Sequence, residues 1–113
     1  MERAEISFSG ATAADATRLA EDLANFVNSH VEGAKAEVAG GSADTMDLGG
    51  AVALLLGAPA FVALARGLAD WIRRQGDPDL VIKIGKCSVT IRGGLDPAAK
   101  KEIILAALEK GAA

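Results

Sequence analysis

The chain has 113 residues and a formal net charge of −3; half of the residues are hydrophobic, only 4% are aromatic and tyrosine is absent. This length suits a single domain, residues 1–113, with one core of Ala, Leu, Val and Ile side chains. Acidic and basic residues are interspersed, without a basic cluster or a set of aromatic stacking residues, which argues against a nucleic-acid partner.

The N-terminal segment predicts a strand followed by a helix. Residues 3–9 alternate between apolar and polar, with Ile6 and Phe8 on one face, as in a half-buried strand that we expect at the centre of the sheet. Thr12, three residues before Asp15, resembles the start of a capping box and predicts that a helix begins here. The apolar stripe of this helix consists of Ala16, Leu19, Ala20, Leu23, Phe26 and Val27.

A second short strand is predicted over residues 34–39, with Lys35 and Glu37 pointing outward. A strand, a helix and a strand within this length favour a parallel, right-handed crossover. Residues 40–44 are rich in glycine and predict a loop. The N-terminal residues contain charges but no apolar signal-peptide core, so we expect a cytoplasmic protein.

The longest apolar stretch is residues 48–65, which contain no formal charge and are just long enough for a membrane-spanning helix. Pro59 interrupts the stretch, because proline lacks a backbone donor and its ring clashes with the preceding helical turn. After Pro59 the pattern is amphipathic, with Arg66, Asp70 and Arg73 on the polar side. The apolar side consists of Phe61, Leu64, Ala65, Leu68, Trp71 and Ile72. We therefore expect a core helix of a soluble domain, with Trp71 as a core anchor, rather than a membrane span.

The part before Pro59 is predicted as a separate short helix over residues 47–56. Its apolar stripe consists of Leu48, Val52, Leu55 and Leu56. Leu54 then lies on the opposite side, and Val62, after the break, flanks the core stripe of the next helix. Contiguous exposed apolar residues are typical of an interaction surface, so Leu54, Ala58 and Val62 are the predicted partner-binding residues.

Residues 79–92 predict a β-hairpin with a two-residue turn at Gly85-Lys86, where glycine comes first as in a type II′ turn. The apolar face of this register consists of Leu80, Ile82, Ile84, Cys87, Val89 and Ile91. A shift by one residue would mix the two faces. After the hairpin, Asp96 and Pro97 predict the start of a last helix, and Gly111 predicts its end.

These elements predict an α+β fold in the order β-α-β-α-β-β-α. Four strands, each with one apolar face, are expected to form a mixed sheet, and helices with one apolar stripe are expected to cover one face of it. The expected architecture is a two-layer sandwich.

No group of residues in the sequence predicts catalysis, a cofactor or a metal site. Cys87 is the only cysteine, which excludes an internal disulfide, and it falls on the core face of the hairpin, where a thiol is inert. His30 is the only histidine and lies near a helix end without a marked catalytic partner. The glycine pairs match no phosphate-binding fingerprint. Four acidic residues fall on solvated faces: Glu5, Glu21, Asp22 and Glu37. We therefore expect a protein that is not an enzyme.

The middle and end of the chain resemble a known family. An apolar, glycine-interrupted stretch leads to Leu-Ala-Asp-Trp-Ile-Arg at residues 68–73, and a hairpin segment and a short terminal helix follow. This order resembles the bacterial effector-associated constant component family over roughly residues 44–110, although the turn at Gly85-Lys86 is shorter than the Asp-Gly turn usual there. The resemblance implies a non-enzymatic partner of an effector, often a protease-like domain, in NTP-regulated bacterial defence systems.

Three functions remain to be distinguished. The first is an adaptor or regulatory module that docks or assembles an effector protein, with a homo-oligomer as a further expectation. The second is a small ligand-binding domain or enzyme whose site is completed across a homodimer. The third is a membrane-active protein that uses residues 48–65, and the amphipathic pattern disfavours it. The expected partners are an effector protein and other copies of the chain, without nucleic acid or stable membrane insertion.

Overall fold

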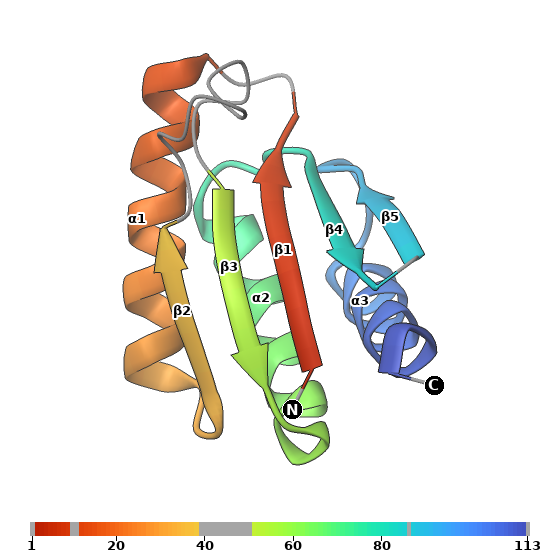
Figure 1. The fold of residues 1–113 in the computed structure, drawn as a ribbon. Coiled ribbons are helices and arrows are strands. Elements are labelled where there is room, and N and C mark those ends of the chain that lie inside the picture. Colours follow the sequence, from red (N-terminus) through yellow and green to blue (C-terminus); the bar gives the residue numbers. More distant parts are fainter. Residues whose placement is uncertain (1, 10–11, 39–50, 86, 113) are drawn as a thin grey trace.

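A computed structural model of the chain describes residues 2–9, 12–38, 51–85 and 87–112. Its strands are β1 (Glu2–Phe8), β2 (Ala34–Val38), β3 (Ala51–Leu56), β4 (Leu80–Ile84) and β5 (Cys87–Ile91). Its helices are α1 (Ala13–His30), the short 3-10 helix η2 (Ala58–Ala60), α2 (Phe61–Arg74) and α3 (Pro97–Ala112). The strands form one sheet in the order β2-β3-β1-β4-β5, with α1, α2 and α3 on one side of it and α1 near the β2 edge (Figure 1). The predicted α+β class and the central position of the first strand are confirmed.

The sheet differs from the predicted one in having five strands instead of four and only antiparallel neighbours. Strand β3 lies between β2 and β1 and pairs antiparallel with both, so β1 and β2 run parallel to each other without direct hydrogen bonds. The segment from β1 to β4 therefore has the split β-α-β topology of ferredoxin-like folds, and β5 and α3 extend it. This topology serves many unrelated functions, so the fold by itself does not specify a function.

The segment before Pro59 is the largest correction to the predicted elements. Residues 51–56 form β3 and not a helix, so their side chains alternate between the two sides of the sheet. Leu55, which the helical pattern placed in the core, is 38% exposed. A short apolar run is compatible with the period of a helix or of a strand. Here the segment is a strand because it pairs with β1 on one side and with β2 on the other. Predicted helix residues 47–50 and the predicted loop 40–44 lie outside the described residues.

A single hydrophobic core lies between the sheet and the helices. Ile6 of β1 and Ile82 of β4 contribute its sheet side, and Leu23 of α1 contributes to its helix side. All six predicted stripe residues of α2 are buried, as expected. Trp71 is 3% exposed and its ring centroid lies 6.0 Å from that of Phe8, which confirms its predicted position as a core anchor. None of the helices in the described residues is both long and apolar enough to cross a membrane.

Helix α1 begins at the predicted cap and also covers one edge of the sheet. The backbone N–H of Asp15 donates to the Thr12 hydroxyl over 3.2 Å. Near the other end of α1, the Asn28 side chain accepts from the backbone N–H of Ala36 and donates to its carbonyl, each over 2.9 Å. These two bonds satisfy outward-facing backbone groups of edge strand β2, which would otherwise be open to another strand.

The β4–β5 hairpin has the predicted register, with Ile84 opposite Cys87 and Ile82 opposite Val89. The φ of Gly85 is +57°, as the first central position of a type II′ turn requires. Helix α3 begins at Pro97 as predicted, but it continues to Ala112. Gly111 therefore lies inside α3, where it packs against Ile84 of β4, and does not end the helix.

Candidate interaction surfaces

The structure separates the three residues that the sequence predicts as a partner-binding group. Ala58 in η2 and Val62 in the first turn of α2 are exposed, Val62 to 47%. Leu54 is only 2% exposed, because it lies on the helix-covered side of β3 between Ala4 and Ala36 of the neighbouring strands. The predicted exposure of Leu54 is therefore wrong. The error follows from reading a strand period as a helical one, and the alternation of Ala51 and Ala53 with larger residues was the available signal.

Ala58 and Val62 belong to a small exposed apolar surface, which we call the end patch and define as Ala58, Pro59, Val62 and Ala63. The patch borders a groove of about 530 Å³ between the α1–β2 turn and the β3–α2 connection. The groove is lined by Glu32, Gly33, Gly57, Pro59, Ala60 and Ala63. Among the described residues that line it, only Glu32 is charged. The surface therefore suits an apolar group that is accompanied by a positive charge.

The second candidate surface is the side of the sheet opposite the helices, which we call the open face. Its outward side chains are Arg3, Glu5 and Ser7 of β1, Lys35 and Glu37 of β2, Ala51, Ala53 and Leu55 of β3, Val81 and Lys83 of β4, and Ser88 and Thr90 of β5. Ala51, beside Ser7 at one end of this face, is only 5% exposed. A shallow groove of about 390 Å³ lies over part of it, lined by Arg3, Lys35, Glu37, Ala53, Leu54 and Leu55.

Two rows of side chains cross this groove from β2 to β1. The basic row is Lys35, Leu55 and Arg3, which are direct neighbours in the strand register. The acidic row is Glu37, Ala53 and Glu5, in the same order of strands. The four charged side chains are exposed, and none of them is in an ion pair within the described part of the chain. Glu5 also has Lys83 of β4 beside it in the strand register, without an ion pair between them. The four side chains can therefore bind charged groups from outside.

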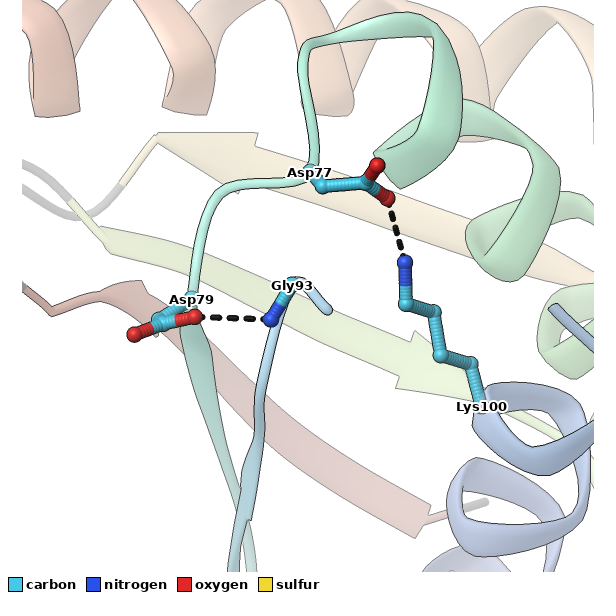
Figure 2. Close-up of polar contacts among 4 residues, drawn as sticks. All are labelled: Asp77, Asp79, Gly93 and Lys100. Carbon is cyan, nitrogen blue, oxygen red and sulfur yellow. Dashed lines mark hydrogen bonds and ion pairs between the residues drawn. The ribbon is translucent and has the colours of Figure 1, made fainter. Parts of the chain in front are cut away.

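A polar corner joins the end of α2 to the start of α3 (Figure 2). Helix α2 ends in a Schellman motif: the N–H of Gly76, with φ of +83°, donates to the Arg73 carbonyl, and that of Asp77 donates to the Ile72 carbonyl. This turn directs the Asp77 carboxylate at Lys100 of α3, whose ammonium donates to it.

The neighbouring loop packs closely on the same corner. The Asp79 carboxylate accepts a hydrogen bond from the backbone N–H of Gly93 over 2.7 Å, and a side chain at Gly93 would overlap the Asp77 carbonyl. Lys100 is fully buried and ion-paired, so this corner has a structural role in holding α3 against the end of α2. The sequence contains a signal for the burial of Lys100, which stands in helical spacing with buried Ile104 and Ala107, but none for its partner.

The remaining candidate residues do not converge on a reaction site. Cys87 lies on the predicted side of the hairpin but is half-buried, because it begins an edge strand. His30 is the last residue of α1; its ring stacks on Phe26 with centroids 5.0 Å apart, and Arg74 lies over the same Phe26 ring at 5.5 Å. Among the described residues, no three His, Cys, Asp or Glu side chains are grouped so that they could hold a metal ion.

A scan against protein-family models and searches for similar curated proteins and solved structures gave no match.

Proposed function

We propose that the protein is a non-enzymatic, cytoplasmic interaction module that docks an effector protein through the end patch. The observation that carries the proposal is the exposed apolar surface at Ala58, Pro59, Val62 and Ala63. Val62 stands out in α2, since the stripe residues of this helix are buried while Val62 is 47% exposed. Contiguous apolar residues at a surface favour a protein contact.

The groove beside the patch suggests the chemistry of the partner. Its lining is mostly glycine, alanine and proline, which leave room for an inserted apolar side chain, and Glu32 lies at the same groove. An effector that presents an apolar side chain next to Lys or Arg would fit, because the apolar group gains from burial and the positive charge pairs with the carboxylate.

The resemblance to the effector-associated constant component family supports the choice of an effector, with a protease-like domain as the proposed class. Four of the six residues that carry the family-like Leu-Ala-Asp-Trp-Ile-Arg pattern are buried: Leu68, Ala69, Trp71 and Ile72. The pattern therefore relates mainly to packing of α2. The end patch, at the other end of the same helix, is where we place the partner contact.

The test is affinity capture from the native host with tagged protein, comparing the wild type with Val62→Asp. A charge in the centre of the contact should reduce recovery of the bound effector by about tenfold or more. Val38→Asp is the matched control, because Val38 is also an exposed valine, at 40%, but lies on β2. Both exposed substitutions should change the free energy of unfolding by less than about 0.5 kcal/mol.

The proposal predicts that the wild type and Val38→Asp capture the same protein, identified by mass spectrometry as containing a protease-like domain, and that Val62→Asp does not. Equal capture by all three proteins would place the contact elsewhere. Capture of a protein without such a domain would contradict the proposed class of effector.

A further inference from the structure

The charges on the open face are arranged so that the face is complementary to itself. In the basic row, Lys35 and Arg3 flank Leu55, and in the acidic row, Glu37 and Glu5 flank Ala53. The rows lie side by side, two residues apart along each strand, which is about 7 Å. Each positive side chain therefore has a negative one next to it along its own strand.

We propose that the open face binds a second copy of this chain and forms a twofold-symmetric dimer. The axis lies between the two rows and parallel to them, so that the basic row of each copy faces the acidic row of the other. Lys35 then faces the partner subunit's Glu37, and Arg3 faces the partner subunit's Glu5. A twofold interface requires this kind of self-complementary surface.

The charge pattern favours this axis over the two obvious alternatives. An axis along β3 would bring Lys35 opposite the partner subunit's Arg3, so that like charges meet. An axis along β1 would bring Arg3 and Glu5 each opposite its own copy. Like charges facing each other across an interface are strongly unfavourable. Of the three arrangements, the one with its axis parallel to the rows pairs opposite charges.

The apolar contacts and the area of the open face are consistent with a weak dimer. Leu55, one of the exposed large hydrophobic residues, lies between the basic side chains and would face the partner subunit's Ala53, whose small side chain leaves space for it. Strand spacing and rise give the face an extent of roughly 24 by 20 Å, so two such faces bury at most about 1,000 Å² in total, and less where Ala51 is already covered. This area is at the lower limit of specific interfaces, so we expect dissociation constants on the order of micromolar or weaker.

The dimer does not depend on the proposed effector, because the open face and the end patch share no residue. The dimer has two end patches, one on each chain, so one dimer would bind two effector molecules. Val62→Asp should accordingly leave the dimer intact, and a failure of either proposal can be recognised separately.

The experiment is a charge exchange followed by sedimentation velocity of the purified full chain over a concentration series up to about 1 mM at low salt. One variant, Arg3→Glu with Lys35→Glu, makes both rows acidic. The other, Glu5→Lys with Glu37→Lys, makes both rows basic. Each variant alone should associate at least about tenfold more weakly than the wild type, because every facing pair then has like charges.

Mixing the two variants should restore the dimer as a heterodimer, because each acidic row then faces a basic row. The matched control is Arg66→Glu with Arg73→Glu, which changes net charge as the first variant does but on exposed positions of α2, and it should dimerise like the wild type. If an exchanged variant unfolds, Lys35→Glu and Glu37→Lys on edge strand β2 repeat the comparison with single changes.

Three results would overturn the proposal. The first is a wild-type protein that stays monomeric over the whole concentration series. The second is a dimer that persists in both exchanged variants, which would indicate another surface, such as the free edge of β5. The third is a mixture that remains monomeric although both folded variants are present, which would reject the proposed axis.

Discussion

The two sides of the sheet are built from the same strands but differ in burial: one side forms part of the core and the other is largely exposed. On the covered side, Ile6, Val52 and Ile82 are at most 2% exposed and belong to the core. On the open face, the alternate residues of the same strands are charged or small, and Leu55 is 38% exposed. The difference indicates that stability depends mainly on the covered side, whereas the open face can vary with little effect on the core. Substitutions that distinguish the two sides test this separation.

The largest difference is expected between two neighbouring leucines. Leu54→Asp places a carboxylate among buried apolar groups and should lower the free energy of unfolding by more than about 4 kcal/mol. Leu55→Asp, one residue later, points to the open face and should cost less than about 1 kcal/mol. Urea unfolding followed by circular dichroism measures both. Equal losses would mean that β3 does not separate the two sides as described.

A smaller effect is expected at the polar corner that holds α3 on the covered side. Asp77→Ala leaves the fully buried ammonium of Lys100 without its partner and also places alanine at a φ of +56°, so it should cost about 3 kcal/mol or more. Lys100→Met removes the buried charge and keeps a chain of similar length, while Asp77, whose side chain is 45% exposed, can be hydrated. Lys100→Met should therefore cost less than Asp77→Ala.

Thermal or urea unfolding of the two corner variants and of the double variant gives their coupling energy. Both variants remove the ion pair, so if Lys100→Met is the more destabilising of the two, other contacts of the lysine side chain, and not the burial of an unpaired charge, determine the loss.

The smallest effect concerns the edge where the two sides meet. Asn28→Ala removes both hydrogen bonds to Ala36 of β2, and part of the loss is offset by the higher helix propensity of alanine. We expect a net loss of about 1 kcal/mol. Asn25→Ala is the matched control, because Asn25 is exposed on the same helix, and it should be neutral or slightly stabilising. Hydrogen exchange at Ala36 should accelerate in Asn28→Ala alone; unchanged exchange would contradict the role of Asn28 at this edge.

Much of the fold was predictable where the sequence contains polar residues that mark a period. The hairpin register followed from the alternation between residues 80 and 91, and α2 followed from charged residues opposite an apolar stripe. Residues 51–56 contain no polar side chain, so only the alternation of Ala51 and Ala53 with larger residues distinguished a strand from a helix there. The helical period wrongly placed Leu54 on the surface and Leu55 in the core. As a result, Leu54 was wrongly included among the three predicted partner-binding residues.

The candidate surfaces were predictable only in part. Val62 was identified because it falls outside a helical stripe, and Ala58 because it lies at the break before Pro59; both are local properties that the sequence contains. The basic and acidic rows of the open face could not be predicted, because each row combines residues from β1, β2 and β3 that are far apart in the chain. The ion pair of Lys100 could not be predicted for a similar reason, since its partner Asp77 is 23 residues away.

The sequence alone determined the α+β class, the cap of α1, the break at Pro59, the amphipathic α2 and the β4–β5 register. These features depend on side chains within a few turns or one hairpin of each other, so local spacing specifies them. Only the tertiary structure decided that β3 is a strand between β2 and β1, that Leu54 is buried, and that the rows on the open face exist. Each of these depends on backbone hydrogen bonds between distant segments, and an apolar run without polar markers does not encode which segment it pairs with.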